Sequence, residues 1–205
     1  MLHELSTLPS FYTEPTVHPD ARGCFHEWFK ATEFESFTGH PFALQQANMS
    51  VSRAGVLRGL HFTAVFPGQQ KYVTCVSGEI WDVLVDVRLG SETFGRWEGV
   101  TLSEENRRCL YIPDGFAHGF AAVRDSTVCY LTSSEYDPNV DFGVDPLDSS
   151  LGIEWPVTDP ILSDKDRAAP GLDEAREHLP TAEDCEELLN MYKDGWVLAN
   201  EEAQQ

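Results

Sequence analysis

The chain has no hydrophobic run long enough to cross a bilayer. A membrane-spanning helix needs about 20 consecutive, mainly apolar residues, and the 205-residue sequence contains no such segment. Its first residues, Met1 to Leu5, also lack the basic and apolar regions of a secretory signal. We therefore expect a cytoplasmic protein that does not bind membranes.

Basic residues are scarce. The sequence has 14 Lys and Arg against 34 Asp and Glu, a formal net charge of -20, which repels nucleic acid at long range. We therefore expect no nucleic-acid partner. Nine of the basic residues nevertheless fall between positions 22 and 108, so a small anionic ligand is still compatible with the sequence.

Cysteine pairs are missing as well. The five cysteines are odd in number and scattered, without a C-x-x-C pair, which disfavours a zinc site or a disulfide framework. We expect all five to be reduced and buried as small hydrophobic side chains.

What the sequence does have is a succession of short apolar and β-branched runs from about residue 42 to 133. Turn signals such as Ser77-Gly78 and Pro113-Asp114-Gly115 separate them, and strands at intervals of roughly 8 to 12 residues are typical of antiparallel sandwiches and barrels. No βαβ spacing or glycine-rich phosphate loop is present. The pattern predicts an all-β fold with strands at residues 42–52, 71–76, 79–87, 96–102, 109–112, 119–123 and 126–132.

Helical segments are expected only at the two flanks. Residues 26–37 fit a strand followed by a short helix, and Thr181, three residues before Asp184, matches a capping box at the start of a short acidic helix. We therefore expect a single domain over residues 1–205, with the barrel core at about 42–133 and a C-terminal loop and helix at about 134–205. A frayed tail is expected after about Asn200.

Arg58-Gly59-Leu60-His61-Phe62 is the most informative stretch of the sequence. Side chains alternate along a strand, so Arg58 and His61 lie on opposite faces unless the backbone turns at Gly59. A histidine beside a fixed cation is a candidate base, because its unperturbed pKa lies near neutrality. A histidine hydrogen-bonded inside a sheet explains these five residues equally well.

A second histidine, His118, follows a turn in Pro113-Asp114-Gly115-Phe116-Ala117-His118-Gly119. The segment matches the P-x-G-x-x-H half of the cupin signature, but the H-x-H half of metal-binding cupins is reduced here to His61-Phe62-Thr63. At most two histidines and a carboxylate would then hold a metal ion. We therefore expect no metal, and a structural turn histidine is the alternative to a functional role for His118.

Three more segments carry residues that could act in a polar pocket. Lys71 opens a strand, and Asp82 lies on the opposite face from Trp81 in the next one, where a carboxylate is costly unless it is paired. Lys71 and Asp82 could meet across a barrel interior, or Asp82 could lie on an exposed polar face. Tyr130 is either a core aromatic or a phenol directed into the pocket, and the charged segment 161–167 by itself is typical of a solvated turn.

Together these motifs resemble the dTDP-4-dehydrorhamnose 3,5-epimerase family. The resemblance extends from about Glu14 to Arg167 and rests on five segments in register: Arg58 to Phe62, Lys71, Ser91-x-Thr93-Phe94-Gly95-x-Trp97, Ile112 to Phe120, and Leu162-Ser163-x-Lys165-Asp166. It implies a cupin-type jelly-roll barrel of antiparallel strands in an enzyme that is free of metal and cofactor and usually homodimeric. It also implies a step in the nucleotide-sugar route to L-rhamnose.

The resemblance further implies a role for each candidate residue. In a 4-keto sugar, the hydrogens at C3 and C5 are both alpha to the ketone, so each can be removed and returned to the other face. His61 would be the base, oriented by Asp166, while Tyr130 donates the proton and Lys71 stabilises the enolate oxygen. The other residues would bind or position the substrate, a dTDP-4-keto-6-deoxyhexose: Arg22 and Arg58 at the phosphates, and Glu27, Gln46, Asn48, Asp82, His118, Asp141 and Lys165 at further polar contacts.

Two departures from the family pattern concern how many carbons are inverted. Leu131 stands where many members have Lys, and segment 63–70 contains Pro67-Gly68; both variations also occur in single-position epimerases. The alternatives are an epimerase acting at C3 only and a 3,4-ketoisomerase on the same scaffold. A non-catalytic sugar-nucleotide-binding cupin is disfavoured, because binding alone does not require His61, Tyr130 and Asp166 together.

Overall fold

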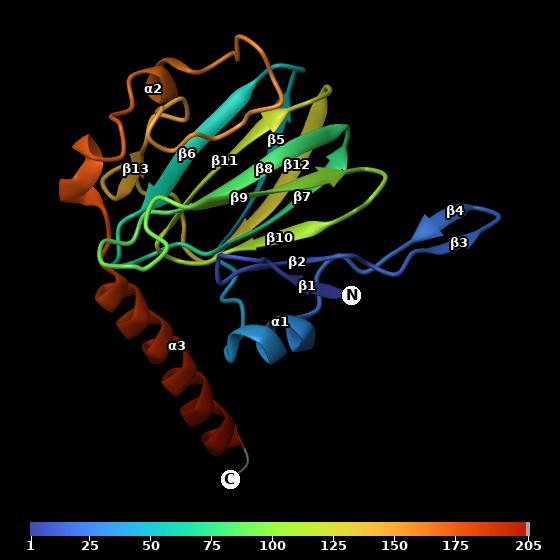
Figure 1. Cartoon of the computed structure of the whole chain (residues 1–205). Helices are drawn as coiled ribbons and strands as arrows, with labels where there is room; N and C mark the ends of the chain where they lie inside the picture. Colours follow the sequence, from blue (N-terminus) through green and yellow to red (C-terminus); the bar gives the residue numbers. More distant parts are fainter. Residues whose placement is uncertain (204–205) are drawn as a thin grey trace.

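Two antiparallel β-sheets face one another in the computed structural model, which describes residues 1–203 (Figure 1). The six-stranded sheet has the order β1-β2-β10-β7-β12-β5, formed by Leu2–Glu4, Phe11–Thr13, Cys109–Ile112, Lys71–Ser77, Ser126–Thr132 and Gln46–Ser52. The five-stranded sheet has the order β13-β6-β11-β8-β9, formed by Asp141–Gly143, Leu57–Thr63, Phe116–Ala122, Glu79–Asp86 and Trp97–Ser103. The predicted all-β jelly-roll barrel is confirmed.

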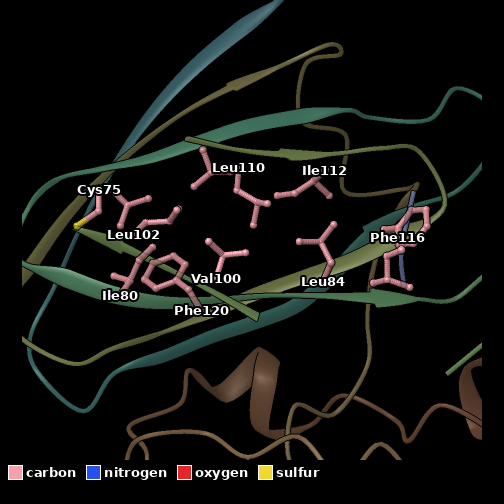
Figure 2. Packing of buried hydrophobic residues seen from close by; sticks show 12 residues of the cluster. Cys75, Ile80, Leu84, Val100, Leu102, Leu110, Ile112, Phe116 and Phe120 are labelled. Carbon is pink, nitrogen blue, oxygen red and sulfur yellow. The ribbon is translucent and has the colours of Figure 1, made fainter. Parts of the chain in front are cut away.

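The main hydrophobic core fills the space between the two sheets (Figure 2). Both sheets contribute inward-facing side chains to it, among them Val73 and Ile112 from one and Ile80, Leu84 and Phe120 from the other. Because residues two apart share a face of a strand, Asp82 lies on the same inner face as Ile80 and Leu84. This strand therefore carries a carboxylate into the barrel interior.

Both sheets are also partly covered on their outer faces. Val83 and Val85 of β8 pack with residues of the C-terminal segment such as Leu172 and Leu179, whereas helix α1 (Ala31–Thr38) packs Phe34 beneath the six-stranded sheet. A strand buried on two faces has apolar residues at consecutive positions, which explains the run from Val83 to Val85.

The barrel extends beyond the expected bounds of residues 42–133. Strands β1 and β2 add to the edge of the six-stranded sheet and β13 to the edge of the five-stranded sheet, although each has only three residues. The strand expected at the start of residues 26–37 is absent, and a hairpin of β3 (His18–Asp20) and β4 (Gly23–Phe25) precedes α1 instead. This hairpin extends away from the barrel (Figure 1), and its Cys24 is exposed rather than buried.

The C-terminal helix is longer than predicted. After the short helix α2 (Asp164–Arg167) and the 3₁₀ helix η1 (Glu174–His178), α3 covers Ala182–Ala203 and continues past Asn200, where a frayed tail was expected. Thr181 accepts a hydrogen bond from the backbone N–H of Asp184, as the capping pattern predicts. Only the first turns are anchored by buried side chains, Cys185 and Leu188, and the rest of α3 runs away from the sheets (Figure 1). Residues 204 and 205 lie outside the described part of the chain.

Within residues 1–203, no helix has both the length and the apolar character needed to cross a membrane.

Asp114 lies in the turn between β10 and β11, where burial of its ionised carboxylate lowers the stability of the folded protein. Burial raises its pKa to about 6, although a hydrogen bond from Gln70 counteracts the shift. The bond joins Gln70 Nε2 to Asp114 Oδ2 at 3.0 Å, and Oδ1 is buried without a partner among the described residues. Ionised Asp114 is therefore only partly compensated.

We expect Asp114→Asn to stabilise the protein at alkaline pH. The unfolded carboxyl titrates near its ordinary value, so the wild type loses stability as the pH rises from about 4 to about 6 and carries the full cost, roughly 3 kcal/mol, above that. Denaturant unfolding at pH 8 should show a gain of this order in the free energy of unfolding, and a smaller gain at pH 5. Equal stability of the two proteins at pH 8 would contradict the assigned cost.

Candidate active site

A bulge in β6 brings Arg58 and His61 to the same side of the strand. In the pairing of β6 with β11, Phe120 lies opposite Arg58 but His118 lies opposite His61, so β6 has one residue more than its partner. Gly59 accommodates this with a φ of 114°, and a Cβ there would come within 2.6 Å of the Gly119 Cα. Only glycine fits this close approach.

The two side chains line a cavity of about 230 Å³ between the sheets. Five strands and helix α2 contribute to its wall. The lining residues are Ser50 from β5, Arg58 and His61 from β6, Lys71 from β7, His118, Gly119 and Phe120 from β11, Val128 and Tyr130 from β12, and Ser163, Lys165 and Asp166 from α2 and the residue before it.

His61 and Asp166 form a hydrogen-bonded pair although they are 105 residues apart. The distance from His61 Nε2 to Asp166 Oδ1 is 2.6 Å, and the Asp166 side chain is only 4% exposed. Ser163 caps α2 by accepting a hydrogen bond from the Asp166 N–H, which fixes the start of this four-residue helix. Burial opposes ionisation, but the His61 imidazole and the Ser163 hydroxyl together hold the pKa of Asp166 below its usual value.

A second histidine–carboxylate pair lies beside the first. His118 Nε2 is 2.7 Å from Asp82 Oδ1, and His118 is the cross-strand neighbour of His61. Asp82 is fully buried, and its Oδ2 has no partner among the described residues. Of the two interpretations of Asp82, the exposed polar face is therefore wrong.

Lys71 and Tyr130 enter the cavity from the opposite sheet. Burial lowers the pKa of Lys71, and the negative charges of Asp141 and Asp82 partly restore it. No hydrogen bond to the Lys71 ammonium is present within residues 1–203, so the predicted meeting of Lys71 and Asp82 is electrostatic at most. Burial raises the pKa of Tyr130, although nearby Arg58 counteracts this. The Tyr130 ring packs against the main core while it also lines the cavity, so both interpretations of this residue are met.

Of the predicted substrate-binding residues, Arg58, His118 and Lys165 line this cavity, whereas Gln46, Asn48, Asp82 and Asp141 are not among its lining residues. Arg58 donates from Nε to Ser52 Oγ at 2.9 Å. Gln46 donates to Asn48 at 2.7 Å, and Asn48 pairs in register with Tyr130. At the α2 side, Lys165 Nζ is 2.6 Å from Asp141 Oδ2.

The arrangement places an imidazole, a phenol and an ammonium around one cavity, and groups of these kinds can take part in proton transfer at carbon. Within the described residues, no group of three or more His, Cys, Asp or Glu side chains is arranged to hold a metal ion. The prediction that the protein needs no metal is not tested by this finding and stays a prediction.

Comparison with known proteins gives a consistent result. The family model described as dTDP-4-dehydrorhamnose 3,5-epimerase matches residues 7–174. The chain belongs to this epimerase family. The dTDP-4-dehydrorhamnose 3,5-epimerase of Mycolicibacterium smegmatis is 50% identical over 198 residues, which cover 95% of this chain and 98% of the relative.

Solved structures of epimerases share the fold closely. An epimerase of Mycobacterium tuberculosis is 44% identical, with a TM-score of 0.91 and coverage of 94% of this chain and 99% of that one. A 3'-monoepimerase from Streptomyces bikiniensis, solved in complex with dTDP-quinovose, is 43% identical, with a TM-score of 0.89 and coverage of 93% and 98%. The predicted cupin-type epimerase fold is therefore confirmed.

The cavity lined by His61, Lys71 and Tyr130 is called the epimerase cavity below. Two residues that family resemblance assigns to the substrate lie away from it. Arg22 is on the projecting hairpin, where its side chain is 90% exposed and pairs with Asp20 at 2.5 Å. Glu27 pairs with Lys30 at 3.3 Å and borders a different hollow near the N-terminus. The isolated chain therefore does not bring Arg22 and Glu27 to the other candidate residues.

Two cavity residues with polar side chains, Ser50 and Ser163, were missed by sequence reasoning. Ser50 lines the epimerase cavity, and its hydroxyl is buried without a hydrogen-bond partner among the described residues. Its spacing of two from Asn48 and four from Gln46 places it on the same face of β5, which is a signal the sequence contained. Ser163 was noted only as part of a motif, and its capping role depends on the helix that follows.

We expect His61→Ala to raise the pKa of Asp166, because burial would then act without the imidazole that favours the carboxylate. A ¹³C NMR titration of the Asp166 carboxyl would measure this. His118→Ala is the matched control, since it removes an imidazole bonded to Asp82 and should leave the Asp166 titration unchanged. An unaltered Asp166 pKa in His61→Ala would show that the pair does not form.

Proposed function

We propose that this protein epimerises a dTDP-4-keto-6-deoxyhexose at C3 and C5, converting dTDP-4-dehydro-6-deoxy-D-glucose to dTDP-4-dehydro-L-rhamnose. One observation carries the proposal: the His61–Asp166 pair and Tyr130 line the same cavity from different sheets. Epimerisation requires a base on one face of the carbon and an acid on the other. Opposite walls of one cavity meet that requirement.

His61 acts as the base in this proposal. When its Nε2–H donates to Asp166, the lone pair is on Nδ1, which accepts the proton from the carbon next to the ketone. The resulting imidazolium is stabilised by the Asp166 carboxylate, whose lowered pKa keeps it ionised at neutral pH.

The electron pair released from the carbon moves to the ketone oxygen and forms an enolate. Lys71, buried and without a hydrogen-bond partner among the described residues, is available to that oxygen as a preorganised cation. Asp141 and Asp82 favour its charged form. Tyr130, kept protonated by its raised pKa, then returns a proton to the opposite face, and solvent restores both groups.

The anionic diphosphate of the substrate explains why an acidic protein has basic residues around this cavity. Arg58 borders the cavity with its guanidinium held by Ser52 and Val51, and a planar guanidinium suits phosphate oxygens. The bound dTDP-quinovose of the Streptomyces bikiniensis relative supports a dTDP-sugar as ligand. His118, Gln46, Asn48, Asp141 and Lys165 would contact the remaining polar groups of the substrate.

An epimerase acting at C3 only is the second candidate. Its support is that a 3'-monoepimerase resembles this chain almost as closely as the Mycobacterium tuberculosis epimerase does. The two candidates share the base, the acid and the enolate, and they differ in whether C5 also reaches His61.

We further propose that the protein acts as a homodimer. Arg22 and Glu27 lie outside their own cavity, and the hairpin before Glu27 projects from the barrel (Figure 1). A second copy could receive this segment and thereby complete the phosphate site. Cytoplasmic location, expected from the sequence, remains a prediction.

Incubation with dTDP-4-keto-6-deoxyglucose in D₂O tests the function. We expect NMR to detect deuterium at both C3 and C5, because each carbon would pass through an enolate. Label at C3 alone would favour the 3-epimerase, and absence of exchange with intact binding would leave only a sugar-nucleotide-binding protein.

His61→Ala should abolish exchange at both carbons, because it removes the proposed base. Strict loss of activity with EDTA would contradict metal independence.

Mixing two inactive variants tests the homodimer. If Arg22 serves the partner's cavity, Arg22→Ala and His61→Ala should both be inactive alone, yet regain up to about a quarter of wild-type activity when refolded together, since one of the two cavities in a mixed dimer is then intact and half of the dimers are mixed. Failure of the mixture to regain activity, while light scattering gives a dimer, would mean that Arg22 acts in its own chain or not at all.

A further inference from the structure

A second cavity, of about 410 Å³, lies at the end of the barrel between the sheets, α1 and α3. Asp114 and Gln70 border it, together with Arg88, Tyr111, Cys185 and Leu189. It shares no lining residue with the epimerase cavity. Adjacent residues of the chain nevertheless line the two cavities, because Gln70 of the second cavity immediately precedes Lys71 of the epimerase cavity.

The loop before Lys71 is held from two sides. On one side, the Gln70 N–H donates to Ser133 Oγ at 2.8 Å and the Gln70 carbonyl accepts from the Ser133 N–H at 3.0 Å. On the other side, the buried Gln70 amide donates to Asp114 Oδ2. Gly68 is packed so closely there that a Cβ would come within 2.4 Å of Asp114 Oδ1 and 2.7 Å of a Leu188 methyl. Asp114 and α3 therefore support this loop by direct packing against Gly68, and Asp114 also accepts the hydrogen bond from Gln70.

Lys71 depends on its backbone for its location. Its ammonium has no hydrogen bond to hold it among the described residues, and its side chain is almost completely buried. Its place in the cavity is consequently decided by where β7 begins, at the residue after Gln70. A shift of the loop would move the ammonium relative to the enolate oxygen it is to stabilise.

We propose that Asp114 is a positioning residue for Lys71, acting through its hydrogen bond to Gln70 and its contact with the loop at Gly68. The inference rests on the proposed epimerase function for the role of Lys71. It assigns Asp114 no contact with the substrate, because Asp114 borders the second cavity and not the catalytic one.

The location of Lys71 can be measured without substrate. The protein has only four lysines, Lys30, Lys71, Lys165 and Lys193, so the Cε resonances of lysine-labelled protein can be assigned by substitution. In the wild type the pKa of Lys71 is lowered by burial. In Asp114→Ala we expect that pKa to move toward the ordinary lysine value as the ammonium gains access to water.

Asp114→Asn separates the hydrogen bond from the charge. The asparagine carbonyl can still accept the hydrogen bond from Gln70. In this variant the pKa of Lys71 should therefore stay at its wild-type value, and kcat should remain within about twofold of wild type. Asp114→Ala should lower kcat by about tenfold or more with little change in KM, because a displaced Lys71 weakens stabilisation of the transition state. Gln70→Ala removes the other end of the bond and should reproduce this loss if Asp114→Ala fails to fold.

A double-mutant cycle tests whether Asp114 acts through Lys71. In a Lys71→Met background, with deuterium exchange as the assay, Asp114→Ala should cause less than about a twofold further loss. If the loss of exchange rate in the double variant equals the product of the two single losses, the proposal is overturned. An unchanged pKa of Lys71 in Asp114→Ala would also overturn it.

Glu98→Ala is the matched structural control. Glu98 anchors Ser6, Thr7 and Leu8 by accepting their N–H groups and does not border the catalytic cavity. We expect it to lower stability without altering the Lys71 titration or kcat. Absence of exchange activity in the wild-type protein would contradict the proposed function. The pKa of Lys71, measured without substrate, would still test the positioning role of Asp114.

Discussion

The close approach of β6 to β11 at Gly59 and Gly119 is the contact on which the epimerase cavity depends. A Cβ on Gly59 would meet the Gly119 Cα, and a Cβ on Gly119 would meet the Arg58 carbonyl, each at 2.6 Å. Two glycines in contact let β6 take an extra residue without losing its pairing, and the bulge turns Arg58 and His61 to the same side. A regular strand would have separated the guanidinium from the imidazole.

The cavity combines buried carboxylates with histidines in a protein that is already strongly acidic. Asp82 and Asp166 are both buried, and each is paired with an imidazole within 2.7 Å. A buried carboxylate without a partner would be costly, so the two histidines are structural requirements of the fold as well as candidates for chemistry. Asp114 differs, because its partner is a neutral amide and its pKa is raised as a result of burial. The stability of the barrel therefore depends on pH in opposite directions at Asp166 and Asp114.

Much of the barrel could be predicted from the sequence because its strands are short, apolar and separated by turn residues. The predicted strands at 79–87 and 126–132 match β8 and β12 almost residue for residue. The short strands β1, β2 and β13 at the borders of the two sheets could not be predicted, because a three-residue strand is too short to show a periodic pattern in the sequence. The length of α3 escaped prediction for a related reason, since its distal half buries little apolar surface and so carries a weak amphipathic pattern.

The sequence by itself determined the residue types of the site and the location of Asp82 and Trp81 on opposite faces of one strand, because strand periodicity is a local property of the chain. The structure decided that the face with Asp82 is the buried one. It also contained the motifs that identified the family. Only the tertiary structure decided which carboxylate pairs with which histidine, since Asp166 meets His61 across 105 residues and Asp82 meets His118 across 36. The same holds for Arg22, which a motif assigns to the phosphates but which the projecting hairpin carries away from its own cavity. The His61–Asp166 pair forms where α2 packs against β6, and the Asp82–His118 pair forms between the neighbouring strands β8 and β11 of one sheet, so both depend on long-range contacts that no local pattern specifies.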